Sequence, residues 1–162
     1  MNKILLTAIM VATAFPAYAA KPAPIGYTIF CMNQPGYCKI TMANKIEKTY
    51  ANMSKIGRIN MAVNASIKPV NDATEKWSVN VSTGDCEDYA LTKRQRLIDA
   101  GFPAGALRIA VTRHNGQLHA VLIVKTTGGD FVLDNLNNRL IGKSQSGYNW
   151  LWVASENPMI GE

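Results

Sequence analysis

The sequence predicts an α+β fold, with helices first and an antiparallel meander of strands after them. Residues 43–65 and 86–100 place apolar side chains on one face, at the three- to four-residue period of an amphipathic helix. Three strand-like runs follow at 107–112, 118–125 and 131–133. The chain has 162 residues, of which 48% are hydrophobic and 17% charged, so it has room for one globular domain.

Turn residues separate these elements. The Asn115-Gly116 pair predicts a tight hairpin between the first two strand-like runs, and Gly128-Gly129 predicts a second hairpin. Residues 67–81 show little periodicity, so they predict a loop between the two helices. This loop carries Trp77, which either lines a cleft or packs in the core.

The first residues have the pattern of a secretory signal peptide. Lys3 precedes an apolar run at 4–15, and Ala17-Tyr18-Ala19 offers a small-x-small cleavage site. The run is shorter than the roughly 20 residues of a membrane-spanning helix, which disfavours an uncleaved anchor. We therefore expect residues 1–19 to be a signal peptide and residues 20–162 to form one periplasmic domain without a membrane span.

The charge distribution argues against nucleic-acid binding. The formal net charge is +6, but the seventeen Lys and Arg residues are scattered, with a single cluster at 93–96. A scattered basic surface mainly aids solubility. Nucleic-acid binding requires a basic stripe with interleaved aromatic residues, and export from the cytoplasm also argues against it.

The three cysteines divide into a candidate pair and a remaining thiol. Cys31 and Cys38 flank a Pro35-Gly36 turn, which can bring them within disulfide range. Two free thiols are the alternative, which an oxidising compartment disfavours. Cys86 is then left unpaired.

Cys86 is the candidate nucleophile. It falls in the first turn of the helix at 86–100, which Asp85 can cap and Gly101 can end. Free N–H groups and the positive end of the helix dipole favour a thiolate at such a position. A thiolate nucleophile also needs a histidine nearby to act as base and acid.

Only two histidines are available. His114 adjoins the predicted hairpin turn, where a polar turn residue is the simpler interpretation. His119 lies in the strand-like run at 118–125 and is either a structural histidine or a base. Asp134 ends the next run, so a hairpin can place its carboxylate beside His119, in the orienting role of a triad. Otherwise Asp134 simply starts a turn before Asn135.

Three sequence blocks closely resemble the bacterial transglutaminase-like cysteine proteinases: Gly84–Ala90 (GDCEDYA), His119–Leu122 (HAVL) and Leu133–Asn135 (LDN). The resemblance extends to the Cys31–Cys38 loop, to residues 60–64 and to Trp77. It implies a papain-like or transglutaminase-like fold and a cysteine endopeptidase with Cys86, His119 and Asp134 as its catalytic triad. The best understood members are periplasmic proteases that release biofilm by cutting a surface adhesin under the control of an inner-membrane receptor, so the resemblance implies partners of these kinds.

The resemblance also implies a calcium ion held by the acidic residues around the nucleophile, Asp85, Glu87 and Asp88. From the residues alone, these side chains can instead cap the helix and complement its dipole. Carboxylates so close to Cys86 disfavour its thiolate. A bound calcium, with its preference for carboxylate oxygens, would offset that field.

Two other functions remain open at this point. The same triad can transfer the acyl group to an amine instead of water, which would make the protein a protein-glutamine acyltransferase or cross-linker. A catalytically idle periplasmic binding module is the third alternative.

Overall fold

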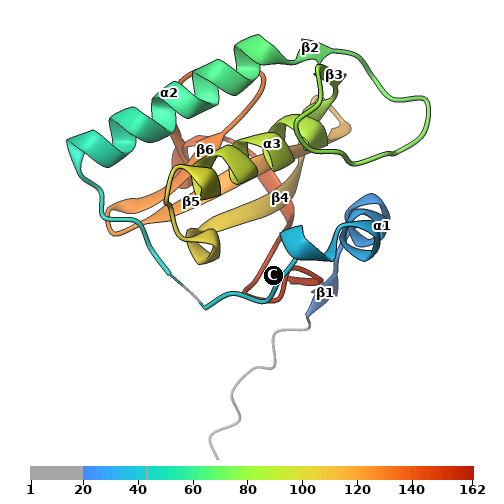
Figure 1. Cartoon of the computed structure of the whole chain (residues 1–162), viewed down its shortest axis with the longest axis horizontal. Coiled ribbons are helices and arrows are strands. Elements are labelled where there is room, and N and C mark those ends of the chain that lie inside the picture. Colours follow the sequence, from blue (N-terminus) through green and yellow to red (C-terminus); the bar gives the residue numbers. More distant parts are fainter. Residues whose placement is uncertain (1–19, 43) are drawn as a thin grey trace, which may run out of the picture.

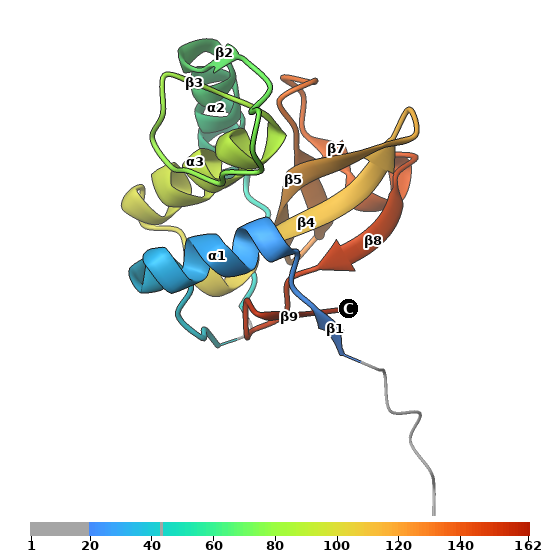
Figure 2. The same cartoon turned by 90° about the vertical axis from the view of Figure 1, so that its right-hand side faces the viewer.

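The computed structural model describes residues 20–42 and 44–162. The predicted signal peptide, residues 1–19, lies outside them. Three helices lie on one side of a curved antiparallel sheet: α1 (Ile25–Asn33), α2 (Tyr50–Ser66) and α3 (Cys86–Asp99) (Figures 1 and 2). The predicted α+β class is confirmed. No helix among the described residues is both long enough and apolar enough to cross a membrane.

The main sheet has five strands in the order β7-β6-β5-β4-β8. The three predicted runs form its centre, as β4 (Leu107–His114), β5 (Gln117–Thr126) and β6 (Gly129–Leu133). Its edges are β7 (Ile141–Gly142) and β8 (Asn149–Val153), which the sequence analysis did not predict. All its neighbouring strands are antiparallel.

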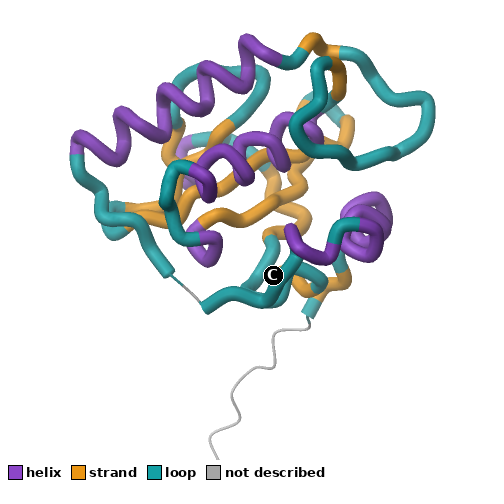
Figure 3. Tube along the Cα trace, viewed as in Figure 1, coloured by secondary structure: helices purple, strands orange, loops and turns teal. Residues whose placement is uncertain are grey.

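Among the described residues, two further pairs of short strands lie outside the main sheet. One joins β1 (Lys21–Pro22) to β9 (Ile160–Gly161), so the two ends of the domain lie together. The other joins β2 (Lys68–Pro69) to β3 (Thr83–Gly84) at the base of the long loop that Figure 3 shows in teal. Short 3₁₀ turns lie at η1 (Pro35–Tyr37), η2 (Ala104–Ala106) and η3 (Lys143–Gln145).

The predicted hairpin between β4 and β5 forms as its turn residues require. Asn115 has φ +49° and Gly116 has φ +82°, and a two-residue type I′ turn needs positive φ at both positions. The ladder consequently extends to the pair His114–Gln117. Because register sets which side chains share a face, this turn fixes which residues of β5 point toward the helices.

The apolar core lies between the sheet and the helices. Alternate residues of the central strands, including Ile109, Leu122 and Leu133, pack there against Ile56 of α2 and Leu97 of α3. A smaller apolar cluster covers the opposite face of the sheet, where buried strand residues meet side chains near and in β8; its members are Ala110, Val121, Ile123, Val132, Tyr148, Trp150 and Val153. Both faces are thus covered, as the continuous burial along β4 and β5 requires.

The helix predicted at 43–65 begins later than expected. The Thr49 hydroxyl accepts a hydrogen bond from the Asn52 N–H at 3.1 Å, so Thr49 caps α2 and the helix starts at Tyr50. Ile46, which the helical period included, is instead buried in a bridge to Thr126 of β5. Tyr50 is 91% exposed and takes no part in the core.

Helix α3 agrees with its predicted bounds. Gly101 has φ +91°, and the Phe102 N–H bonds the Leu97 carbonyl at 3.0 Å, which is a Schellman end. Asp85 occupies the N-cap position, but its side chain makes no capping hydrogen bond. Its carboxylate accepts the Asp72 N–H at 3.1 Å instead, so it ties the long loop to the start of α3.

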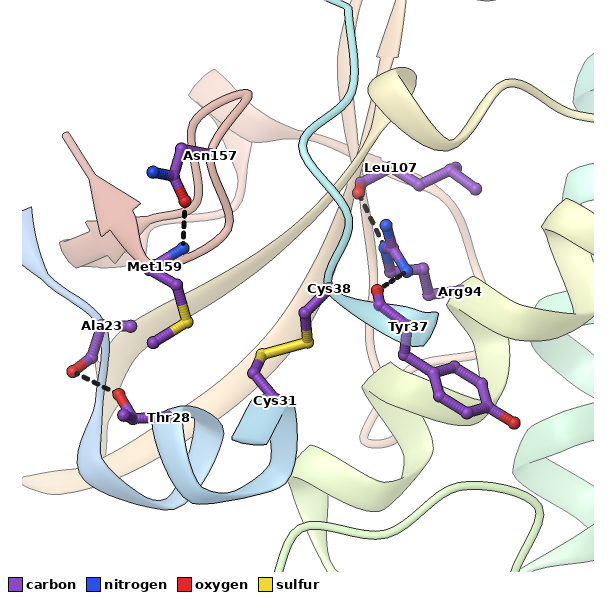
Figure 4. The surroundings of a disulfide bond; sticks show 9 residues. All are labelled: Ala23, Thr28, Cys31, Tyr37, Cys38, Arg94, Leu107, Asn157 and Met159. Atoms are coloured by element: carbon purple, nitrogen blue, oxygen red, sulfur yellow. Dashed lines mark hydrogen bonds between the residues drawn. A yellow bond between two sulfur atoms is a disulfide. The ribbon is translucent and has the colours of Figure 1, made fainter. Parts of the chain in front are cut away.

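A disulfide joins Cys31 at the end of α1 to Cys38 after η1, with an S–S length of 2.08 Å (Figure 4). Arg94 of α3 binds the same region, since its guanidinium donates to the carbonyls of Tyr37 at 2.9 Å and Leu107 at 3.2 Å. The disulfide therefore fixes a small loop that α3 holds against the sheet.

Replacing both Cys31 and Cys38 by Ser is expected to lower the free energy of unfolding by about 2 kcal/mol, because the unfolded chain regains the freedom of this short loop. Urea unfolding followed by circular dichroism measures the change. Cys86→Ser is the matched control, since Cys86 is not part of the disulfide. An unchanged urea midpoint in the double variant would contradict the prediction.

Candidate active site

Cys86 opens α3 and faces the central strand β5. The backbone N–H of Ala120 reaches the Cys86 Sγ at 3.3 Å. Helix α3 packs along β5 (Figure 1), so the thiol sits where the first turn of the helix meets the start of the strand. This placement depends on two local features that the sequence predicted, the start of α3 and the β4–β5 hairpin.

His119 precedes Ala120 on β5 and forms a buried pair with Asp134. Its Nε2 lies 2.9 Å from the Asp134 Oδ1, and the two residues are only 7% and 4% exposed. Asp134 directly follows β6, the antiparallel neighbour of β5. The structure thus pairs His119 with Asp134 and places His119 next in the chain to Ala120, whose N–H reaches the Cys86 thiol.

Asp134 is held as an anion. Burial alone would raise its pKa, but hydrogen bonds from His119, from the Tyr148 hydroxyl and from the Leu136 N–H outweigh burial and hold the pKa of Asp134 below its usual range. Because the carboxylate binds Nε2, Nδ1 is the ring nitrogen of His119 that has no bond to Asp134.

Tyr148 is a member of this site that the sequence analysis missed. Burial and the bond to Asp134 raise the pKa of Tyr148, so its hydroxyl remains a donor. Its ring also packs edge-on against the rings of His119 at 6.0 Å and His114 at 5.8 Å. The short η3–β8 stretch around it carries no motif, and its contact with Asp134 spans fourteen residues, so no local signal marks it.

Of the predicted acidic residues, Glu87 contacts the thiol, while Asp85 and Asp88 bind backbone N–H groups of the long loop. The Cys86 Sγ lies 3.4 Å from the Glu87 Oε2, and the Asp88 Oδ1 accepts the Ser78 N–H at 2.7 Å. Burial and the neighbouring Asp85 carboxylate raise the pKa of Glu87 to about 8. Burial and the negative charges of Asp85 and Asp72 raise the pKa of Asp88 to about 6. Burial is therefore the main reason that Glu87 and Asp88 bind a proton more tightly than exposed carboxyl groups do.

The thiol itself is neutral in this state. Burial is the largest cause, and together with the charges of Glu87 and Asp85 it raises the pKa of Cys86 to about 12, although the Ala120 N–H acts in the opposite direction. The expected advantage of the helix N-terminus is therefore outweighed by burial and by neighbouring carboxylates.

The acidic residues suit a hard cation by their chemistry. The Asp85 Oδ1 is buried without a hydrogen-bond partner, and carboxylate oxygens are the ligands that calcium prefers. Gly84 leaves room for Asp88, because a Cβ at position 84 would collide with its carboxylate. Within residues 20–42 and 44–162, however, no three Asp, Glu, His or Cys side chains already converge as a metal site. Each carboxylate is turned to its own hydrogen-bond partner.

Trp77 is a packing residue. It is buried, and its ring lies 5.2 Å from the ring of Tyr27 on α1. Trp77 also lines a hollow between α1 and the long loop, so it both packs in the core and borders a surface depression.

This fold, with a helix-start cysteine against a strand that carries a histidine, defines a transglutaminase-like cysteine peptidase. The family model described as "Bacterial transglutaminase-like cysteine proteinase BTLCP" matches residues 17–159. The chain belongs to this family. Among curated proteins, none matches the chain.

Several solved structures of LapG from Legionella pneumophila share the fold. The calcium-bound form is 22% identical with a TM-score of 0.55, and it aligns over 66% of each chain. A second LapG structure is 24% identical with a TM-score of 0.56, over 66% of this chain and 65% of LapG. The EGTA-treated form is 22% identical with a TM-score of 0.54, and the alignment covers 66% of this chain and 64% of LapG. The chain thus spans about two thirds of the LapG chains that it matches.

Proposed function

We propose that this protein is a periplasmic, calcium-dependent cysteine endopeptidase whose catalytic residues are Cys86, His119 and Asp134. The observation that carries the proposal is the buried bond between His119 Nε2 and the anionic Asp134, next to the strand position whose N–H reaches the Cys86 thiol. This arrangement has the three roles of a catalytic triad, namely a nucleophile, a base and a group that orients the base.

The reaction follows from these roles. His119 Nδ1 takes the proton of the Cys86 thiol, and the sulfur attacks the carbonyl carbon of a peptide bond. The Cys86 backbone N–H, at the start of α3, is positioned to stabilise the oxyanion. The imidazolium then gives its proton to the leaving amine, which leaves an acyl-enzyme. Water, activated by the same imidazole, releases the acid product and frees the thiol. Asp134 stabilises the imidazolium throughout.

The proposed calcium ligands are Asp85, Glu87 and Asp88. The supporting observations are the unpartnered Asp85 Oδ1 and the burial of Glu87 and Asp88, which raises the pKa values of both carboxyl groups. The solved calcium-bound and EGTA-treated forms of LapG are in keeping with such a site. When bound, the ion would supply positive charge that offsets the carboxylate field around Cys86.

The proposed setting is the periplasm. Supporting it are the signal-peptide pattern of residues 1–19 and the Cys31–Cys38 disulfide, a bond that persists in oxidising compartments. By resemblance to the family, the substrate is a protein such as a surface adhesin, and an inner-membrane receptor is the regulatory partner.

One experiment tests the proposal. Purified residues 20–162 and their Cys86→Ala variant are incubated with periplasmic and surface-protein extracts, with calcium or with a chelator, and new N-termini are identified by mass spectrometry. The expected termini need both Cys86 and calcium. New termini that depend on Cys86 but also form in the presence of chelator would overturn the proposed calcium dependence. If no terminus depends on Cys86, the peptidase proposal fails. Attachment of an amine probe to the extract proteins would instead indicate acyl transfer to amines.

Tyr148→Phe is expected to lower kcat about tenfold, because losing its hydroxyl loosens the carboxylate that orients His119. The hydrogen bond lowers the pKa of Asp134. Its loss therefore raises that pKa, and the acid limb of the kcat/KM profile moves to higher pH. Tyr50→Phe is the matched control, since Tyr50 is exposed on α2. An unchanged pH profile in Tyr148→Phe would contradict this role.

A further inference from the structure

A groove opens beside the His119–Asp134 pair. Its volume is about 540 Å³, and it lies between the tip of the β4–β5 hairpin and the segment from Asp134 to Tyr148. Figure 2 shows the hairpin tip projecting away from the helix layer. The groove shares Asp134 and Tyr148 with the candidate site, so whatever fills it lies next to the two residues that hold His119 in place. Its size suits a few side chains of an extended peptide.

The position of the groove indicates which part of a substrate fills it. His119 lies between the Cys86 contact at Ala120 and the wall formed by Asp134. In the proposed mechanism His119 protonates the leaving amine, so that amine must lie on the His119 side of the thiol. The chain that continues from the amine is the segment on the C-terminal side of the scissile bond. It therefore leaves over His119 toward this groove.

The groove has positive charge without a matching negative charge. Arg113, at the hairpin tip, is exposed, and its guanidinium donates to the Gly116 carbonyl at 2.9 Å. No carboxylate pairs with Arg113 among the described residues. Asp134 is the one carboxylate in the groove wall, and His119, Tyr148 and Leu136 already bind it.

We propose that this groove binds the substrate segment on the C-terminal side of the scissile bond, and that Arg113 selects an acidic side chain in that segment. The inference rests on the proposed endopeptidase function and adds a substrate class to it. A guanidinium with free N–H groups is suited to bind a carboxylate, and a position beside the leaving group lets it distinguish substrates. Arg113 is thus a specificity residue that takes no part in the proton transfers.

The first test is cleavage-site profiling on a proteome-derived peptide library with wild type, Arg113→Gln and Arg113→Glu. Wild type is expected to enrich Asp and Glu within the first positions after the cut. The enrichment should fall about threefold in Arg113→Gln and turn toward Lys and Arg in Arg113→Glu. Arg58→Gln on α2 is the matched control, because it makes the same change of charge away from the groove. Cleavage without acidic preference, or a preference that Arg113→Gln leaves intact, would overturn the proposal while the peptidase function stands.

A second test does not depend on cleavage. A fluorescein-labelled octapeptide with one Glu, and its counterpart with Gln, are titrated with the Cys86→Ala protein, with and without Arg113→Gln. The Glu peptide is expected to bind about threefold more tightly, and Arg113→Gln should abolish the difference. Equal Kd values for the two peptides overturn the groove proposal. Absence of Cys86-dependent cleavage together with the Glu preference would instead count against the peptidase function alone.

Discussion

Replacing His119 by Ala should lower kcat/KM by about 10⁴-fold or more, the largest functional effect that we expect from a single substitution. His119 is the base that activates Cys86 and the acid that protonates the leaving amine in the proposed mechanism. Its removal leaves a buried thiol whose pKa is raised to about 12, and such a thiol has no means to ionise near neutral pH.

The two histidines of the chain allow a close comparison. His114→Ala should lower kcat/KM far less than His119→Ala, because His114 lines the groove and packs against Tyr148 but has no hydrogen bond to Cys86 or Asp134. Activity on a peptide substrate and the rate of iodoacetamide labelling of Cys86 are both measured, and far-UV circular dichroism checks the fold. Equal losses in the two variants would show that His119 is not the base. Substantial activity in His119→Ala would lead to the same conclusion.

Local sequence signals predicted the parts of the fold that are built from adjacent residues. The Asn115-Gly116 turn imposes positive φ at two positions, and it sets the β4–β5 register that the structure shows. Gly101 ends α3 for a similar reason. The predicted start of α2 was wrong because the helical spacing of apolar residues continues back to Ile46. The helix itself begins only after Thr49, whose side chain caps it. In the folded protein Ile46 instead forms a β-bridge with Thr126 of β5.

Elements that depend on distant partners were missed. Strand β8 is five residues long and forms by pairing with β4, roughly forty residues earlier in the chain. Helix α1 was not predicted because its sequence has no clear polar face; its apolar residues Ile25, Ile29 and Met32 are exposed while Tyr27 and Phe30 are buried.

The candidate site shows the same division. Cys86, His119 and Asp134 could be proposed from residue type, spacing and resemblance, because each lies at the end or start of a predictable element. Tyr148 could not, since its role depends on how the segment before β8 folds back onto β6. Asp72 was also missed, because the long loop brings it to Asp85 through a backbone contact across thirteen residues.

Replacing Lys93 by Met should stabilise the protein at neutral pH, which is the second large effect that we expect. Lys93 is fully buried on α3 above the ring of Tyr89, and its Nζ has no hydrogen-bond partner. Burial is the main cause that lowers the pKa of Lys93 to about 7, although the charge of Asp134 acts in the opposite direction. Met has a similar length and no charge to desolvate, so it should fill the same space.

The expected gain depends on pH, with a definite sign. In the unfolded chain the lysine stays protonated up to about pH 10.5, whereas in the folded protein it loses its proton near pH 7. The unfolded state therefore binds more protons between these values, and the stability of wild type rises with pH through this window relative to Lys93→Met. The advantage of the variant should be largest below pH 7 and should shrink by about 4 kcal/mol by pH 10.

Urea unfolding of wild type and Lys93→Met at pH 6.5 and pH 10 measures this change. Comparing the two proteins at each pH cancels the other groups that titrate, including Cys86, Glu87 and Tyr148. Lys68→Met serves as the control, since Lys68 is exposed on β2 and its replacement should give the same small change at both pH values. A Lys93→Met variant that is less stable than wild type at pH 6.5 would mean that the buried ammonium is stabilised in the folded protein. The charge of Asp134 would then outweigh burial at Lys93, and the two residues would be coupled across the base of the active site.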